Sequence, residues 1–561
     1  MPLPSHLLAP LEPENKDLVV TAGRWPDDIA GEYLVSAPHP RYFPASPHAF
    51  FGDGIHYRLS LRPGTHEAGA DQFAWRWHWV DSPSTRLRLK RPDLFEGTLI
   101  GTQSPFGFSN AANTAPLPWK DRLLLTWDVG RPVEVDPHSM RFLGEMGHRD
   151  EWKETLEHPV LPMIASTAHP VTDHDRDCVW TVNLFLGDLY VVRWRGGRSI
   201  DRWPITGARL PQSVHTITVT RNWIIVADCA FKVEPQMLSG GERREPNNAS
   251  GPIYLIRKDS LEATRPGEPV ACTSFELAPE VMHYYALWDD SDGVTILFEH
   301  THNVELGIAM RADDKDATGA PCDPALNGIY GFGMAPSRIT VKSFDPESGL
   351  CRDRAEMTTT DRRWSTQLTA MDWSSEGLER PTMRHTVFHG WRPQTVTQRV
   401  LDLYGDRVDQ RLFPAEETPA RIVSLSMPDL QTSSEYVWPL DELPTSPSFV
   451  PRTGACEPGG HNGYVVLGVY GREGFRVELF DAADVGRGPL ATLAAPQHTV
   501  PFVIHSAWMP TVDTPASAER VRFSDELDRL DGLVADAANA ARVVARELDE
   551  EVPVRNCGPN G

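Results

Sequence analysis

The sequence predicts an all-β fold built from antiparallel hairpins, and three observations support this. From about Gly23 to Pro510, short apolar or alternating runs of four to eight residues are separated by Gly, Pro, Asp and Asn. Runs of this length bounded by turn residues are typical of strands. The chain has 49 prolines and 42 glycines, which disfavour long helices. Its 561 residues favour a β-propeller over a β-sandwich, because a propeller takes roughly 40–50 residues per blade.

The predicted strands follow one another along the chain with little change in texture. In the hairpin 211–228, PQSVHTITVT and NWIIVAD flank a turn at Arg221. Side chains alternate across a strand, so His215, Ile217 and Val219 share one apolar face. No sharp repeat fixes the number of blades. Other predicted strands are DRLLLTWD at 121–128, LYVVRW at 189–194, GPIYLIRK at 251–258, GVTILFEH at 293–300, RITVKSF at 338–344 and NGYVVLGVY at 462–470.

The composition changes only near the C-terminus, where 524–551 is predicted to be an amphipathic helix. We expect its apolar stripe to pack on the body of the protein or on a second subunit. The stripe consists of Leu527, Leu530, Val534, Ala537, Ala541, Val544 and Leu548. Insertions between strands are predicted at 311–331 and 374–383. The predicted divisions of the chain are an N-terminal extension at 1–22, a β-propeller domain at 23–512, and a C-terminal helical extension and tail at 513–561.

Composition excludes several classes of function. The net charge of −23 argues against nucleic-acid binding, which needs a basic surface, and against electrostatic docking on anionic lipid. Seven cysteines without a CxxC pair indicate neither a disulfide framework nor a zinc ribbon. The N-terminal residues lack the pattern of a secretory signal, and no apolar run approaches ~18 residues. We therefore expect a cytoplasmic protein.

Four histidines share one sequence context, each at a strand end among apolar neighbours. A single histidine of this kind is usually a core residue, but the recurrence suggests four ligands that converge on one buried metal. Their wide spacing suits ligands from separate blades that meet on a propeller axis. The four are His169 in STAHP, His215 in SVHTITVT, His283 in VMHYYALW and His505 in PFVIHSAW. His300 and His302 form a rival pair, which we interpret as structural or surface residues.

The chemistry of four imidazoles favours a redox metal. Catalytic zinc commonly keeps three protein ligands, and structural zinc often uses thiolates. Four neutral imidazoles leave a divalent iron its full charge and, in an octahedron, two open positions for dioxygen. The sequence has no phosphate-binding glycine loop, no GxSxG elbow and no HExxH helix, so nucleotide-binding, serine-hydrolase and zincin functions lack support.

Several motifs resemble those of the carotenoid cleavage oxygenases, the family of apocarotenoid- and stilbene-cleaving oxygenases and the retinoid isomerase. The resemblance extends from about Gly31 to Pro510 and includes the four histidine motifs in order. Further matching motifs are GEYLVSAPHPRYFP, HAFFGDGIHYRL and AANTAPLPWKDRLLLTWDVGRPVEVDP. The resemblance implies a seven-bladed propeller with a helical and loop dome over the metal. It also implies Fe(II) as cofactor, held by His169, His215, His283 and His505.

The family holds its ligand imidazoles with three glutamates. By resemblance, Asp128 stands at the first of these positions, and Thr418 and Ser446 stand at the other two. Adjacent Glu416 and Glu417 leave the register at Thr418 open by one or two residues.

Two further motifs are interpreted as structural. Gly52-Asp53-Gly54 is predicted to be a hairpin turn in which glycine supplies a positive φ. Asn113-Thr114 is predicted to be a turn or a backbone cap.

The resemblance implies cleavage of a conjugated carbon–carbon double bond by O2 to give two carbonyl products. Stilbene-cleaving members carry a lysine before the first carboxylate, whereas this chain has Trp127, whose broad apolar face suits a polyene. We therefore expect a carotenoid or apocarotenoid substrate, bound in part by Trp127. The alternatives left open are a stilbene- or phenylpropenoid-cleaving oxygenase and a non-catalytic propeller that binds an apolar ligand. Peripheral membrane contact for substrate uptake and a homodimer also remain open.

Overall fold

The computed structural model describes most of the chain. The described residues are 13–39, 48–95, 104–232, 234, 236–237, 241–291, 293–300, 302–329, 331, 333–358, 364, 366–370, 381–454, 460–512, 519–527 and 530–551. Within them, no helix is long and apolar enough to cross a bilayer. Of the predicted insertion at 374–383, residues 374–380 lie outside the described residues, and Met383 already belongs to a strand.

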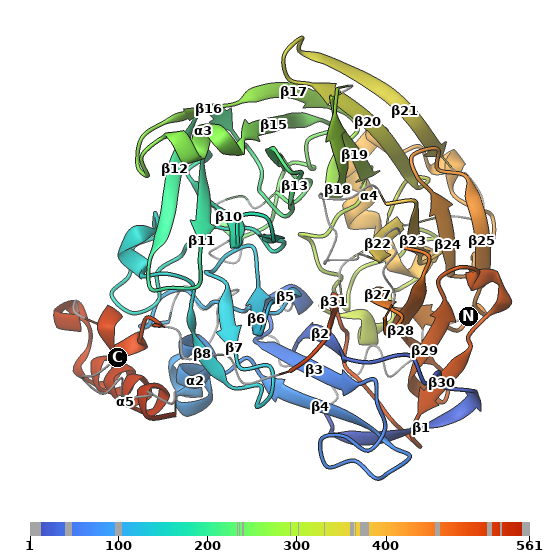
Figure 1. Cartoon of the computed structure of the whole chain (residues 1–561), viewed down its shortest axis with the longest axis horizontal. Coiled ribbons are helices and arrows are strands. Elements are labelled where there is room, and N and C mark those ends of the chain that lie inside the picture. Colours follow the sequence, from blue (N-terminus) through green and yellow to red (C-terminus); the bar gives the residue numbers. More distant parts are fainter. Residues whose placement is uncertain are drawn as a thin grey trace.

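The chain forms a β-propeller, with sheets arranged around a central axis (Figure 1). In the described part of the chain, five sheets have four or five strands each, and a sixth has ten. The first sheet contains β5 (Ala115–Trp119), β6 (Arg122–Thr126), β7 (Val133–Val135) and β8 (Phe142–Glu145). The second contains β9 (Val171–Asp173), β10 (Cys178–Phe185), β11 (Asp188–Trp194), β12 (Ile200–Arg209) and β16 (Val270–Ala271).

Three more sheets continue the ring in chain order, as the predicted succession of hairpins requires. The third contains β13 (Ile217–Val219), β14 (Trp223–Ala227), β15 (Gly251–Arg257) and β17 (Thr273–Leu277). The fourth contains β18 (Val281–Asp290), β19 (Gly293–His300), β20 (Arg338–Asp345) and β21 (Leu350–Thr358). The fifth contains β22 (Thr366–Ala370), β23 (Met383–Phe388), β24 (Arg421–Ser426) and β25 (Thr432–Val437).

The ten-stranded sheet joins the two ends of the chain. Its strands are β1 (Lys16–Gly23), β2 (Glu32–Pro38), β3 (Gly54–Ser60), β4 (Phe73–Trp79), β26 (Leu443–Pro444), β27 (Ser448–Pro451), β28 (Gly463–Gly471), β29 (Gly474–Asp481), β30 (Ala491–Ala494) and β31 (Ser506–Met509). β31 pairs with β2, and β1 pairs with both β30 and β4. The ring is therefore closed by backbone hydrogen bonds between N-terminal and C-terminal strands.

The hydrophobic core lies between neighbouring sheets. One cluster of buried side chains, which includes Trp180, Val191 and Ile224, fills the space between the second and third sheets. Another, which includes Tyr57, Trp75 and Leu479, lies within the ten-stranded sheet. Because strands of a propeller are covered on both faces, they read as continuous apolar runs, such as WIIVA in β14.

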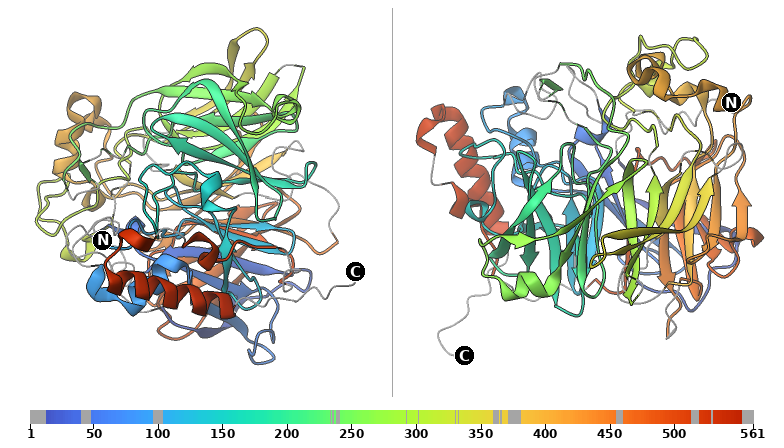
Figure 2. Two further views of the ribbon diagram at one scale, coloured as in Figure 1. Left: turned by 90° about the vertical axis from the view of Figure 1, so that its left-hand side faces the viewer. Right: turned by 90° about the horizontal axis from the view of Figure 1, so that it is seen from above.

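Among the described residues, the α-helices outside the sheets are α2 (Pro83–Lys90), α3 (Lys258–Ala263), α4 (Gln398–Tyr404) and α5 (Ala535–Glu551). α5 and α2 lie side by side on one flank of the propeller (Figures 1 and 2). Ion pairs from Arg86 to Glu551 and from Lys90 to Glu547 join them.

The C-terminal helix begins later than the sequence predicts. It starts at Ala535 rather than at residue 524, and short 3-10 turns precede it. Gly532 interrupts the predicted helix, and glycine costs about 1 kcal/mol in a helix interior. Glu526 is also held by the body of the protein, since its carboxylate accepts hydrogen bonds from the Arg131 guanidinium and the Arg149 amide. Of the predicted stripe, Val534 is exposed, whereas Ala541 and Leu548 are buried.

Candidate metal centre and substrate cavity

The four predicted histidines come together at the centre of the ring. His169 precedes β9, His215 precedes β13, His283 lies near the start of β18 and His505 precedes β31, so the four histidines come from four different sheets, each at or near the start of a strand. One nitrogen from each ring lies within 4.8 Å of the others. The ring centroid of His169 is 4.8 Å from that of His215, 5.1 Å from that of His283 and 4.4 Å from that of His505. The cluster joins residues that are between 46 and 336 positions apart in the chain.

Backbone contacts between sheets hold the histidines in place. The His169 and Thr167 residues both donate to the His215 carbonyl, through the His169 amide at 3.1 Å and the Thr167 hydroxyl at 2.6 Å. The Ser36 amide donates to the His505 carbonyl at 2.9 Å. A β-bulge lies between Val281 and His283 in β18. Bulges re-aim side chains, and here both Met282 and His283 line the same cavity although they are neighbours in a strand.

The cluster fits a divalent metal ion. Two imidazole nitrogens on opposite sides of a metal lie about 4.2 Å apart, twice a typical metal–nitrogen distance, which is close to the spread of the four donors. The His169 Nε2 atom is buried and has no hydrogen-bond partner. Burial, followed by the neighbouring imidazoles, holds the pKa of His169 and of His505 well below the usual range. These rings are therefore neutral and offer lone pairs, as metal ligands must.

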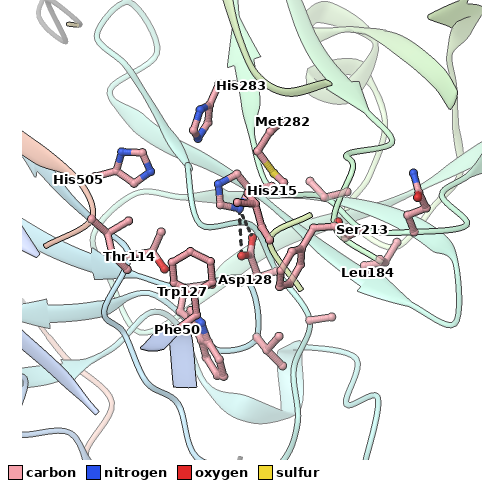
Figure 3. Close-up of a pocket in the computed structure, with 18 of the residues that line it drawn as sticks. Phe50, Thr114, Trp127, Asp128, Leu184, Ser213, His215, Met282, His283 and His505 are labelled. Carbon is pink, nitrogen blue, oxygen red and sulfur yellow. Dashed lines mark hydrogen bonds and ion pairs between the residues drawn. The ribbon is translucent and has the colours of Figure 1, made fainter. Parts of the chain in front are cut away.

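Asp128 connects two of the four histidines. Its two carboxylate oxygens each lie 3.0 Å from the His215 Nδ1 atom, as drawn by the dashed lines in Figure 3. The same carboxylate accepts a hydrogen bond from the Ala168 amide at 3.2 Å, next to His169. A carboxylate beside Nδ1 keeps the imidazole hydrogen on that nitrogen. The Nε2 lone pair is then the one that can bind a metal. Asp128, which the sequence resemblance predicts to support a ligand imidazole, contacts His215 in the structure.

A second carboxylate, Glu299, was missed by sequence reasoning. Its Oε2 atom lies 3.8 Å from the His283 Nδ1 atom, and both side chains are buried. The two residues are cross-strand partners in β18 and β19. The hairpin signal between the two strands was present in the sequence, but two bulges in β18 shift the register. A slip of one residue would have placed Glu299 on the other face.

Thr418 and Ser446, the other two positions that the resemblance assigns to the support of the ligand imidazoles, have different surroundings. The Thr418 hydroxyl accepts a hydrogen bond from the Trp391 amide at 2.7 Å, which ties it to the backbone. Ser446 lines the cavity, and its carbonyl accepts from the Ser506 hydroxyl beside His505. Among the rival histidines, both ring nitrogens of His300 are engaged, one by the Pro279 carbonyl and one by the Thr340 hydroxyl.

A cavity of about 870 Å³ opens onto the histidine cluster. Its wall is mostly aromatic and aliphatic and includes Phe50, Phe51, Phe108, Trp127, Met163, Phe231, Met282, Leu306 and Phe502. Trp127, Asp128, His215, His283 and His505 surround the same space (Figure 3). The Trp127 ring stacks on Phe108 at 6.3 Å and meets the edge of Phe51 at 6.4 Å. Thr114 also lines the cavity, although the sequence predicted only a structural role for it.

The glycine motif is structural, but not for the predicted reason. Neither Gly52 nor Gly54 has a positive φ, and Gly54 begins β3 instead of lying in a hairpin turn. A Cβ atom at Gly54 would lie 2.4 Å from the Ala111 carbonyl oxygen, so close packing demands glycine. The side-chain amide of Asn113 donates hydrogen bonds to the Phe50 and Gly52 backbone carbonyls, at 2.9 and 2.7 Å. It anchors the loop that carries the phenylalanines of the cavity wall.

Several known proteins are similar to this chain in sequence or in structure. The RPE65 family model, described as retinal pigment epithelial membrane protein, matches residues 8–510. The isoeugenol monooxygenase of Pseudomonas nitroreducens is 22% identical over 531 residues, which cover 89% of this chain and 96% of that protein. The lignostilbene dioxygenase of Pseudomonas brassicacearum has a similar structure, with a TM-score of 0.63, 16% identity, and coverage of 91% of this chain and 100% of the other.

The apocarotenoid oxygenase of Synechocystis is also similar in structure, as seen in one of its variants. The TM-score is 0.60 and the identity 14%, with coverage of 90% of this chain and 98% of the other. Structural similarity at this identity shows the shared propeller fold. The family model, in contrast, covers most of the chain, including all four histidines of the cluster. The chain therefore belongs to the RPE65 family of carotenoid oxygenases.

Proposed function

We propose that the protein is a non-haem Fe(II) dioxygenase that cleaves a conjugated double bond of a carotenoid or apocarotenoid. One observation carries the proposal: four imidazoles converge at the wall of a large apolar cavity. The reaction balances without a further reductant, because one O2 molecule and one C=C bond give two C=O groups. Bound iron would supply the activation of O2.

The chain's own residues would bind, orient and shield the reactants. His169, His215, His283 and His505 would hold the metal, and Asp128 would keep the His215 ring in place. The aromatic wall would exclude water and align the double bond near the cluster. Splitting an alkene into two carbonyls requires no general acid or base, which agrees with the lack of an obvious acid–base pair in the sequence.

Two features of the cavity support a polyene substrate. Its volume of about 870 Å³ lies near the upper end of the roughly 300–1,000 Å³ typical of ligand pockets, which suits a long molecule. Among the described residues of the wall, none is a lysine that could pair with a phenolate. Trp127 instead offers an apolar face, whose contact with a polyene is worth roughly 25 cal/mol per Å² buried.

A phenylpropenoid alkene is the second candidate substrate. The observation that favours it is the 22% identity to isoeugenol monooxygenase over most of both chains. Such a substrate carries a phenol, which would need a polar partner in the cavity. Candidates among the wall residues are Thr114, Ser213 and Thr445.

The finer architecture is also part of the proposal. We count the ten-stranded sheet as two blades, β31-β2-β3-β4 and β27-β28-β29-β30, bridged by β1, which gives seven blades in all. The cluster of α4 with Trp364, Trp391 and neighbouring loops would belong to the dome. The oxygenase domain would span 23–512, with β1 at its edge, and 513–561 would be the extension.

Substrate uptake from a membrane surface is consistent with the cavity's rim. Leu186 lines the cavity and is 69% exposed, at the turn between β10 and β11. An apolar side chain in that position could contact lipid without electrostatic attraction. A homodimer stays a prediction.

The test is anaerobic loading with Fe(II), followed by ¹⁸O2 and a panel of carotenoids, apocarotenals, hydroxystilbenes and isoeugenol. We expect one iron per chain and label in the carbonyl products of a polyene, with exchange into water controlled. His215→Ala is expected to abolish iron binding and turnover, whereas His302→Ala, outside the cluster, retains both. Turnover of hydroxystilbenes or isoeugenol alone would overturn the substrate but not the oxygenase. A wild-type protein that binds no iron would overturn the whole proposal.

A further inference from the structure

Glu299 lies in a position that suits a metal-supporting carboxylate. It faces His283 across the β18–β19 pair, and directly opposed residues of antiparallel strands have Cβ atoms about 4.5–5.5 Å apart on one face. The Glu299 Oε2 atom lies 3.8 Å from the His283 Nδ1 atom. The Tyr285 hydroxyl donates to the same oxygen at 3.4 Å. The carboxylate is thus buried and oriented beside the imidazole.

The sequence positions expected to support the cluster do not all carry a carboxylate. Ser446 and Thr418 have no carboxylate, and the Thr418 hydroxyl already accepts a hydrogen bond from the Trp391 backbone amide. Asp128 alone would leave a buried divalent ion with a single compensating charge. A buried charge is costly unless it is paired. Asp128 and Glu299 together would balance the two positive charges of the ion, since histidine binds a metal as the neutral imidazole.

We propose that Glu299 is the positioning residue for His283 and supplies, from the neighbouring strand, the second carboxylate of the metal centre. The inference rests on the proposed function, because it takes His283 as a metal ligand. Glu299 would accept the His283 Nδ1 hydrogen and so direct the Nε2 lone pair toward the other three histidines. It acts through His283 and does not touch substrate or metal.

The chain provides a matched control. Glu280 is also buried and lies 3.7 Å from a histidine, since its Oε2 atom is near the His302 Nδ1 atom. It precedes β18 and is further held by the Asn303 amide and by Arg407. His302 is outside the cluster. A purely structural role for buried glutamates near histidines would affect both positions alike, whereas metal support would affect only Glu299.

The experiment compares Glu299→Gln, Glu299→Asp and Glu280→Gln with the wild type. Apo-protein is titrated with Co(II) in competition with a chelator, and the visible spectrum of the bound ion is recorded. Far-UV circular dichroism and thermal unfolding check the fold. We expect Glu299→Gln to weaken Co(II) binding about 10–100-fold and to change the spectrum, as loss of an outer partner typically does. Glu299→Asp should recover part of the affinity, and Glu280→Gln should leave it unchanged.

Each outcome decides the point. Wild-type affinity and spectrum in folded Glu299→Gln would overturn the assignment, as would an equal loss in Glu280→Gln. If Glu299→Gln does not fold, Glu299→Asp still tests the idea, because it keeps the charge but retracts it by one methylene. Unchanged binding in that variant would also overturn the proposal. A wild-type protein that binds neither Co(II) nor Fe(II) would overturn the proposed function together with this inference.

Discussion

At the scale of single residues, the centre depends on the surroundings of its imidazoles. Burial and the neighbouring rings lower the pKa of His169 and His505, so protonation does not compete with metal binding near neutral pH. Asp128 then orients His215 and holds the loop of His169 through the Ala168 amide. One side chain therefore influences two ligands, which makes Asp128 the most informative residue for substitution.

Asp128→Ala is expected to lower iron affinity about 10–100-fold, the usual effect of removing an outer-sphere partner. Chelator competition at fixed pH measures the change. Asp128→Asn serves as the matched variant, because it keeps the shape and a hydrogen-bond acceptor but removes the charge, and should lose less than the alanine variant. The prediction fails if Asp128→Ala binds iron as the wild type does.

At the scale of elements, the C-terminal extension is attached through one face of α5. Ala537, Ala541, Val544 and Leu548 enter an apolar cluster with Leu123, Leu125 and other side chains of β6 and β7. Ion pairs with α2 lie beside this cluster. Exposed ion pairs contribute only about 0–1 kcal/mol each, so apolar burial provides most of the attachment.

Leu548→Ala is therefore expected to destabilise the docked helix by about 2–5 kcal/mol, since it removes a side chain that is 2% exposed. Val534→Ala is the matched control. Val534 belongs to the same predicted stripe but is 72% exposed, so its change should stay within about 0.5 kcal/mol. Hydrogen exchange of α5 reports the local stability. Equal effects of the two substitutions would contradict the packing, and iron affinity should be unchanged in both variants.

At the scale of the whole molecule, the apo-protein carries many histidines that are buried neutral. Burial lowers the pKa of five of them to about 4: His48, His300, His385, His389 and His498. In the unfolded chain their pKa is about 6.5. Between these values the unfolded state binds more protons, so the free energy of unfolding falls as the pH falls. Asp228, whose pKa burial raises to about 6, opposes this over part of the range.

We accordingly expect the urea midpoint of the apo-protein to fall steadily as the pH is lowered from 7 to 4.5. Each buried histidine contributes at most about 1.4 kcal/mol per pH unit. Replacing His389 by Gln should flatten the dependence, whereas His302→Gln should not. A midpoint that is constant or rises across this range would show that the buried histidines do not control acid stability.

By itself, the sequence determined the succession of hairpins and the four histidines of the cluster. Both depend on short stretches of sequence. Strands follow from alternating and apolar runs between turn residues, and each histidine lies in its own short apolar motif. The family resemblance placed Asp128 and Trp127 in the same way, because they occupy one contiguous motif.

Only the tertiary structure decided what depends on register and on contacts between distant segments. Glu299 meets His283 because two bulges set the pairing of β18 with β19, and strand register changes faces with every residue. Position 54 has no room for a side chain, because a Cβ atom at Gly54 would lie too close to the Ala111 carbonyl oxygen. The helix α5 starts at Ala535 partly because Arg131 and Arg149 retain Glu526. Such contacts join residues far apart in the chain, and no local pattern records them.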